Sequence, residues 1–344
     1  MKKLVSIEWL RGAASFGVCE MHLFCALDLF SKQDVFFQKY VFPVSIIGRV
    51  GVPVFFVISG FIIPHSMWHN KYKISEWFNF VFRRLIRLDP PYFVSIALML
   101  LTLFGVAYLS GNTNFGVDWQ AILLHFGYLN IFFNKPWLPG VYWSLAVEFQ
   151  YYLLIGLLFP LIAHPNSKLR ILAVILIAVV GHLIFKYVTD NSSYIFIYSS
   201  FFVVGILTFQ RFANLIDLPT FVVLLLPTLA LVYSLHSTAY CVFAAFTSLV
   251  IITNWDIKLK FVHFLGKISY SLYLIHWIVG VELTRKVFLI YWPQPTQSEK
   301  FLVAIVGTLL SVVAAILFYY LIEKPSIRWG NSFKEFSQRK SKLV

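Results

Sequence analysis

Residues 302–322 read LVAIVGTLLSVVAAILFYYLI, a run without a single charged side chain. A helix needs about 20 mostly apolar residues to cross the hydrocarbon core of a bilayer. Further runs of this kind precede it, and we expect membrane-spanning helices near 7–30, 44–66, 88–109, 142–163, 171–188, 194–212, 219–235, 238–253, 268–291 and 300–322. The sequence therefore predicts an all-α, polytopic integral membrane protein with about ten transmembrane helices.

The composition of the 344-residue chain agrees with this prediction, since 59% of it is hydrophobic and only 12% is charged. A soluble domain carries about 25% charged residues, and a disordered chain needs low hydrophobicity. Both classes are excluded. Cys19, Cys25 and Cys241 lie in apolar runs without ligand spacing. We therefore expect them to be core side chains, with neither a disulfide scaffold nor a metal site.

The net charge of +13 is spread between the apolar runs rather than gathered in one patch. If the N-terminus is inside, the predicted inner loops are richer in basic residues than the outer ones. The inner loops include Lys71, Lys73, Arg83, Arg84, Arg87, Lys258 and Lys260, whereas the outer loops hold Lys32, Lys39 and Lys135. Loops rich in Lys and Arg stay cytoplasmic. We therefore expect both termini to be cytoplasmic, and we expect no nucleic-acid partner.

The domain organisation follows from the same pattern. We expect one membrane domain over residues 1–325 and a basic cytoplasmic tail over 326–344. The segment 119–134 is apolar but short and ends at a proline, Pro136. We interpret it as an interfacial or re-entrant piece rather than a further span.

The first apolar run carries ionisable residues, which are costly inside a membrane and are candidates for function. Arg11 and His22 are eleven residues apart, so on a helix they share one face, about 16 Å from each other. Glu8 and Ser15 lie on nearly the same stripe. One interpretation is a structural Glu8–Arg11 ion pair beside a core histidine. The other is that His22 titrates near neutrality and moves a proton.

A second candidate group opens the run at 142–163, which begins WSLAVEFQYY from Trp143. Ser144 and Glu148 are its polar members of interest. The partner of the Glu148 carboxylate must come from elsewhere in the chain. This carboxylate could orient a histidine, act as a base itself, or pair with Arg11 or Arg49.

Three arginines, Arg83, Arg84 and Arg87, precede the run at 88–109 on its predicted cytoplasmic side. Guanidinium groups bind phosphate through two parallel hydrogen bonds. These residues therefore suit the capture of a phosphate-bearing donor, although ordinary positive-inside anchoring is the alternative.

Two further polar residues lie inside apolar runs. Ser59 precedes Gly60, a pair that most often permits close helix packing. His276 follows the stretch ISYSLYLI and could be a hydrogen-bonded core histidine. Both are retained as candidate site residues, whereas we expect no role for the histidines near span ends or in loops, His125 among them.

These pieces occur in an order that resembles the acyltransferase-3 family of bacterial membrane acyltransferases. The resemblance rests on six segments spread over nearly the whole chain: Leu10-Arg11-Gly12 with His22, GVPVFFVISGF at 51–61, RLIR at 84–87 followed by Pro90-Pro91-Tyr92, WSLAVE at 143–148, ISYSLYLIHW at 268–277, and IEKP at 322–325. Glu8, Pro53 and Asp89 depart from the residues usual in the family.

The resemblance implies an O-acetyltransferase that moves an acyl group, usually acetyl, from cytoplasmic acetyl-CoA to a hydroxyl of a polysaccharide, lipopolysaccharide or lipid-linked sugar. It implies residence in the bacterial inner membrane. We expect no metal, because no set of His, Asp and Glu residues has metal-ligand spacing. A hydroxyl that attacks a thioester needs a base, and we expect His22 to act as one. We expect Arg11 or Glu148 to set its orientation and charge state, with Arg83, Arg84 and Arg87 binding the phosphates of coenzyme A.

Two alternatives stay open at this point. An acyl-enzyme relay through His22 or Ser59 could replace direct transfer. A transporter or flippase of a sugar-lipid or small acid would also carry ionisable residues inside its spans, although we find no inverted repeat of the kind that many transporters show.

Overall fold

The predicted apolar runs are all helical in the computed structural model of the chain, which describes residues 4–29, 39, 48–111, 116–189 and 194–340, the last without the side chains of 333–340. Residue 30 and residues 44–47, which belong to the first two predicted spans, lie outside the described residues. No strand occurs among the described residues, so the all-α prediction is confirmed for them.

Within the described residues, seven helical segments are long and apolar enough to cross a bilayer: Gly51–His69, Ile74–Leu109, Gly140–Ile162, Ser167–Tyr187, Ile195–Phe212, Leu218–Leu235 and Gln297–Ser332. A bent pair, Lys260–Lys267 with Ser269–Tyr291, would make an eighth if it forms one span. The first helix, Val5–Ala26, and the 16-residue helix Thr238–Thr253 are not among them. The protein is thus an all-α membrane protein, and the number ten and the side of each terminus stay predictions.

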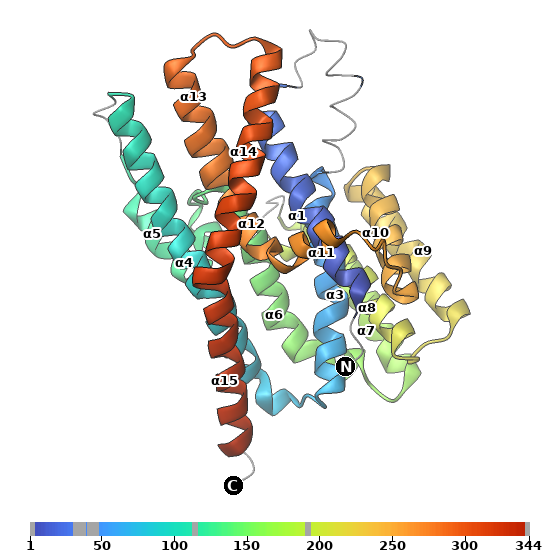
Figure 1. Ribbon diagram of the computed structural model, residues 1–344. Helices are drawn as coiled ribbons and strands as arrows, with labels where there is room; N and C mark the ends of the chain where they lie inside the picture. The colour runs from blue at the N-terminus through green and yellow to red at the C-terminus, as the bar shows by residue number, and fades with distance from the viewer. Residues whose placement is uncertain (1–3, 30–38, 40–47, 112–115, 190–193, 341–344) are drawn as a thin grey trace. The chain divides into compact units, whose positions relative to one another are not determined.

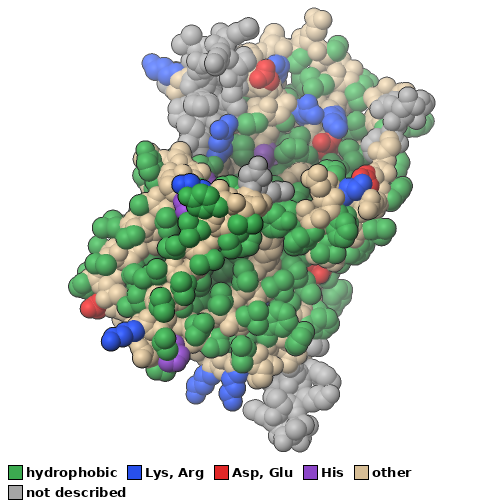
Figure 2. Space-filling view, turned by 180° about the vertical axis from the view of Figure 1, so that it is seen from behind, with side chains coloured by type: hydrophobic (Ala, Val, Ile, Leu, Met, Phe, Trp, Pro, Cys, Tyr) green, Lys and Arg blue, Asp and Glu red, His purple; other side chains and the backbone are tan. Residues whose placement is uncertain are grey.

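The surface of the described residues fits this environment. Large aliphatic side chains such as Leu172, Leu176 and Leu183 on one helix are about half exposed, as expected for residues that face lipid. On the face drawn in Figure 2, hydrophobic side chains predominate and Lys and Arg side chains are few.

The chain divides into two compact units, each described here by itself. The first comprises residues 1–11, 52–81 and 143–260. Its helices within the described residues include α3 (Gly51–His69), α6 (Trp143–Ile162), α7 (Ser167–Tyr187), α8 (Ser199–Phe212), α9 (Leu218–Leu235) and α10 (Thr238–Thr253), with the short turns η2 (Ile74–Glu76) and η6 (Ile195–Tyr198). Helix α8 packs against α7, α9 and α10, and all its residues from Ser199 to Gln210 are buried.

The second unit comprises residues 12–51, 82–142 and 261–344. Helices α1 (Val5–Ala26) and α4 (Trp77–Leu109) contribute most of their length to it. It also contains α5 (Trp119–Leu124), η3 (His125–Gly127), η4 (Asn130–Phe133), η5 (Gly140–Tyr142), α11 (Lys260–Lys267), α12 (Ser269–His276), η7 (Trp277–Arg285), α13 (Lys286–Tyr291), α14 (Gln297–Phe318), η8 (Tyr319–Glu323) and α15 (Lys324–Lys340). Figure 1 shows α15 continuing the line of α14.

Two of the predicted spans differ from the helices in the structure. The run expected at 88–109 begins earlier, because α4 starts at Trp77 and continues through Pro90 and Pro91. Prolines are tolerated within membrane helices, where neighbouring groups satisfy the freed carbonyls. The run expected at 268–291 is helical from Ser269 to Tyr291 but contains the π-helix η7, and α11 before it is bent from it by 71°. A second π-helix, η8, lies between α14 and α15.

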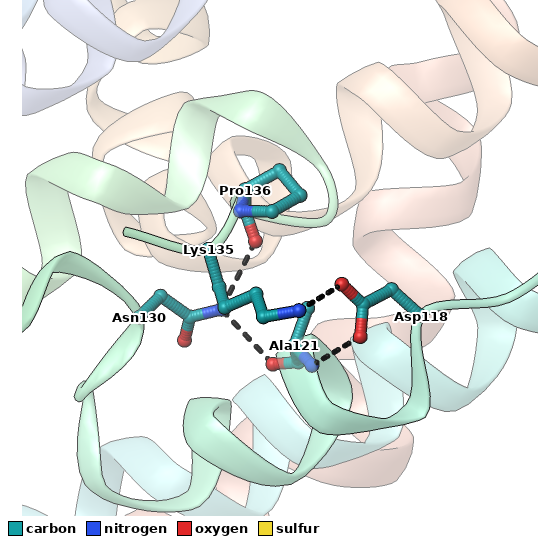
Figure 3. Close-up of polar contacts among 5 residues, drawn as sticks. All are labelled: Asp118, Ala121, Asn130, Lys135 and Pro136. Carbon is teal, nitrogen blue, oxygen red and sulfur yellow. Dashed lines mark hydrogen bonds and ion pairs between the residues drawn. The ribbon is translucent and has the colours of Figure 1, made fainter. Parts of the chain in front are cut away.

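The segment 119–134 forms only short helical turns, as predicted for a piece that does not cross the membrane. Figure 3 shows how its ends are tied together. The Asp118 carboxylate accepts the N–H of Ala121 at 3.0 Å and pairs with the Lys135 ammonium at 2.9 Å. The amide of Asn130 donates to the carbonyls of Ala121 and Pro136. The hydrogen bond from Lys135 lowers the pKa of the Asp118 carboxyl.

His125, for which we expected no role, is fully buried in this segment. The N–H of Leu138 donates to its Nε2 at 3.1 Å, so its Nδ1 carries the proton and donates to the Tyr92 hydroxyl at 2.6 Å. Because burial removes water from the charged form, the pKa of His125 is lowered to about 4. A neutral imidazole therefore ties the loop to helix α4.

Candidate active site

The candidate base, His22, lies on α1 and points to a second histidine. Its Nδ1 is 3.0 Å from Nε2 of His276, and the two rings stack with centroids 5.2 Å apart and planes 19° from parallel. His276 is fully buried at the end of α12 and its Nδ1 is 3.1 Å from the Leu272 carbonyl oxygen. Both residues belong to the second unit. The structure thus joins two predicted site residues into one pair.

The Leu272 carbonyl determines the proton positions of a neutral pair. A carbonyl oxygen only accepts, so His276 Nδ1 must donate to it and His276 Nε2 must carry the lone pair. His276 Nε2 therefore accepts a hydrogen bond from the N–H at Nδ1 of His22. This leaves His22 Nε2 without a proton and able to accept one. The arrangement has the form of a general base whose tautomer is fixed by a partner.

The tryptophan after His276 closes one side of the pair. The ring of Trp277 meets the His22 ring edge to face at 5.2 Å. Its indole N–H donates to Glu282 Oε1 at 3.3 Å, and Glu282 is buried and ion-paired with Lys286. Trp277 and Glu282 are five residues apart in η7, where a π-helix brings such positions onto one face.

Glycines allow α1, η7 and α14 to approach one another here. A Cβ on Gly280 would lie 2.7 Å from the Leu23 side chain and 2.9 Å from the Ser311 hydroxyl, and one on Gly307 would lie 2.6 Å from Leu23. Leu23 follows His22 directly, so this packing fixes the part of α1 that carries the base.

The start of α12 is held by a buried carboxylate. Glu323 accepts both the backbone N–H and the hydroxyl of Ser271. The hydroxyl of Tyr270 donates to the carbonyl of Leu88 on α4 at 2.9 Å. The first-turn N–H groups of a helix need partners from outside the helix. These bonds therefore fix the position of α12 and of His276 at its end.

Glu148, a predicted catalytic residue, lies in the first unit and its partner there is Ser59. The Ser59 hydroxyl donates to Glu148 Oε1 at 2.7 Å, joining α3 to α6. The sequence suggested an arginine or a histidine as the partner of this carboxylate, which stays a prediction; within the first unit the structure shows the Ser59 hydroxyl on it. Ser144, one turn earlier on α6, is buried.

Close packing of α3 on α8 determines where Ser59 lies. A Cβ on Gly60 would be 2.3 Å from the carbonyl oxygen of Phe202, and one on Gly205 would be 2.2 Å from that of Val57. Only hydrogen atoms fit at these positions. The Ser59-Gly60 pair therefore serves helix packing, as one interpretation of the sequence held, and also places a hydroxyl on Glu148.

The three predicted phosphate-binding residues, Arg83, Arg84 and Arg87, lie half-buried near the start of α4. In the second unit, α15 passes beside them: a Cβ on Gly330 would lie 3.7 Å from the Cβ of Arg87 and 3.8 Å from the carbonyl oxygen of Arg83.

The polar residues that the sequence places along one face of the first helix all lie within α1. Ser15 is buried, and Glu8, Arg11 and His22 are half-buried.

The two pairs, His22 with His276 and Ser59 with Glu148, belong to different units, and Arg11 belongs to the first. Over the part of the chain that the structure describes, no three His, Cys, Asp or Glu side chains are grouped so as to hold a metal ion. The recognisable chemistry is therefore that of a membrane protein with a hydrogen-bonded imidazole pair, of which His276 is fully buried.

Comparison with known proteins supplies the family. Residues 4–320 match the family model described as an acyltransferase domain, Acyl_transf_3, and the chain belongs to this family. It is accordingly a membrane acyltransferase. Searches of the curated proteins and of the solved structures returned no match.

Proposed function

We propose that the protein transfers an acyl group, acetyl in the first instance, from cytoplasmic acyl-CoA to a hydroxyl of an envelope glycan or lipid-linked sugar in the bacterial inner membrane. Membership of the acyltransferase family favours this activity over the transporter or flippase that the ionisable residues alone would also allow. The observation that carries the proposal is the hydrogen-bonded series from His22 through His276 to the Leu272 carbonyl.

In the proposed mechanism the acceptor hydroxyl gives its proton to His22 Nε2 while its oxygen attacks the thioester carbonyl carbon. The tetrahedral intermediate then expels the thiolate of coenzyme A. The thiolate takes the proton from His22, which regenerates the neutral imidazole. Throughout, His22 Nδ1–H stays hydrogen-bonded to His276, which stabilises the imidazolium by accepting from it.

We assign the other predicted residues to supporting roles. Arg11, on the same helix as His22, stays a proposed catalytic residue. Arg83, Arg84 and Arg87 are proposed to bind the phosphates of the donor. The Glu148 carboxylate, hydrogen-bonded by Ser59, is proposed as a second catalytic residue that orients the acceptor. Ser144 stays a candidate for the same role.

The test is transfer from labelled acetyl-CoA in membranes that contain the His22→Gln variant, with His69→Gln as the matched control because His69 is exposed at the end of α3. We expect the first variant to lose about 100-fold or more of the transfer rate and the control to keep it. Near-normal transfer by His22→Gln would remove the imidazole from the mechanism.

The acceptor is identified by a separate experiment. Mass spectra of envelope glycans from a deletion strain are compared with those of the complemented strain. We expect one class of glycan to lose the mass of a single acetyl substituent. Restoration by the wild-type chain but not by His22→Gln would link that loss to the proposed site.

A further inference from the structure

A cavity of about 340 Å³ lies between α4 and α13 in the second unit. Five of its seven lining side chains are aliphatic, Val106 and Leu289 among them, and the two polar ones are Ser110 and Lys286. A wall of this composition fits a hydrocarbon chain. The ammonium and the hydroxyl add a place for an oxygen-rich group.

Lys286 is held in place by a buried partner. Its ammonium pairs with Glu282, whose side chain is only 10% exposed whereas that of Lys286 is 35% exposed. A carboxylate is costly to bury unless it is paired, so Glu282 keeps Lys286 where it is. An ammonium has three donors, and one bond to Glu282 leaves others for a ligand in the cavity.

The same carboxylate connects the cavity to the imidazole pair. Glu282 Oε1 accepts the indole N–H of Trp277, and the Trp277 ring contacts the His22 ring. From Lys286 to His22 there is therefore a continuous series of side-chain contacts within one unit. A group that binds at Lys286 lies next to the residues that support the proposed base.

We propose that this cavity binds the acceptor of the transfer reaction, and that the acceptor is an amphiphile whose hydrocarbon chain lies along α4 and α13 while its phosphate binds Lys286. This inference rests on the proposed function and narrows its acceptor to a lipid-linked sugar phosphate. The remaining donors of the Lys286 ammonium and the aliphatic wall favour this occupant over a free sugar, which would leave the wall uncovered.

The experiment measures binding, without acyl transfer, to the full chain in nanodiscs of phosphatidylcholine. The probe is a diazirine-bearing polyprenyl phosphate, and the matched polyprenol lacks the phosphate. The variants are Lys286→Met, Lys286→Arg and the control Lys300→Met, since Lys300 is a half-buried lysine of α14 that does not line the cavity. Thermal unfolding of each variant checks that it is folded.

We expect the phosphate probe to label peptides from α4 and α13, Lys286→Met to weaken its binding about tenfold or more, and Lys286→Arg and Lys300→Met to keep it. Equal labelling by the polyprenol, or unchanged binding by Lys286→Met, would overturn the inference. So would full displacement by inorganic phosphate, which would make the site one for the free ion. Because no donor is used, these results are independent of the His22→Gln assay that tests the proposed function.

Discussion

His22 Nδ1 and His276 Nε2 lie 3.0 Å apart although 254 residues separate them in the chain. Each ring has a distinct task in this contact. His276 is fully buried and bound at its other nitrogen to a backbone carbonyl, so its orientation is fixed. Among the described residues, His22 has a hydrogen-bond partner at Nδ1, and its Nε2 is the nitrogen that we propose for chemistry. Catalysis by a general base requires this division between a supporting group and a reacting group.

Replacement of His276 tests the supporting role. His276→Gln offers an amide oxygen near the position of Nε2 and can still accept from His22, whereas His276→Leu cannot. We expect His276→Leu to lower kcat about 100-fold with little change in KM for the donor, and His276→Gln to recover a substantial part of the loss. Equal activity of the two variants would show that His276 acts by packing alone.

The Ser59–Glu148 hydrogen bond leads to a second prediction. Glu148→Gln keeps an oxygen for the Ser59 hydroxyl but removes the charge, and Ser59→Ala removes one bond and keeps the charge. If the carboxylate orients the acceptor, we expect Glu148→Gln to reduce kcat/KM about tenfold or more and Ser59→Ala to reduce it less. A covalent acyl-Ser59 recovered from wild-type protein after denaturation would contradict direct transfer.

The arginines of α4 are tested by donor binding. We expect Arg84→Gln/Arg87→Gln to weaken binding of acetyl-CoA about tenfold or more, because charge-assisted hydrogen bonds to phosphate are lost. The salt dependence of binding should fall as well. Arg211→Gln, at the end of α8, is the control. Unchanged affinity in the double variant would leave these arginines with a topological role only.

Close packing of α3 on α8 leaves no room for a larger residue than glycine at position 60. A methyl group there would collide with the Phe202 carbonyl, so we expect Gly60→Ala to reduce the free energy of unfolding by about 1–3 kcal/mol and to lower activity by displacing Ser59. Gly105→Ala on α4 is the matched control, since its Cβ would meet nothing within 4 Å. There we expect an unchanged or slightly higher midpoint of thermal unfolding.

The lowered pKa of His125 leads us to expect that the free energy of unfolding depends on pH. Its pKa in the folded protein, about 4, lies below the ordinary value of 6.5, so the unfolded chain binds the proton more readily. The contribution of His125 to the free energy of unfolding is therefore constant above pH 6.5. It falls as the pH drops toward 4, by at most about 3 kcal/mol. Thermal unfolding of wild type and His125→Gln should diverge most at neutral pH and converge on acidification. Parallel curves would contradict this.

Much of the fold could be predicted from the sequence because the bilayer requires a strong pattern. The charge-free run at 302–322 and its counterparts are helical where they are described, apart from a few residues at their ends. The conversion of the 268–291 run into two α-helices around the π-helix η7 could not be predicted, because π geometry depends on how Trp277, Gly280 and Glu282 pack against other helices.

The sequence selects individual candidate site residues, whose roles stay predictions, but it does not indicate which of them lie together. The i, i+11 spacing selected Arg11 and His22, and the cost of a charge in a membrane selected Glu148. Their partners depend on contacts distant in sequence, such as Ser59 for Glu148 across 89 residues, for which no local periodicity exists. His125 was missed because a single histidine in a short loop has no distinguishing pattern.

The π-helix η7 also affects how this segment tolerates a change of length. Each residue of an α-helix turns the chain by about 100°, whereas a π-helix accommodates an additional residue per turn without that rotation being passed on. Deleting one residue between Trp277 and Arg285 would therefore let the segment relax to α geometry and leave the helix beyond it in nearly the same rotation. Lys286 would keep its place on the α4 wall, whereas the same deletion within an α-helix would turn everything beyond it by about 100°.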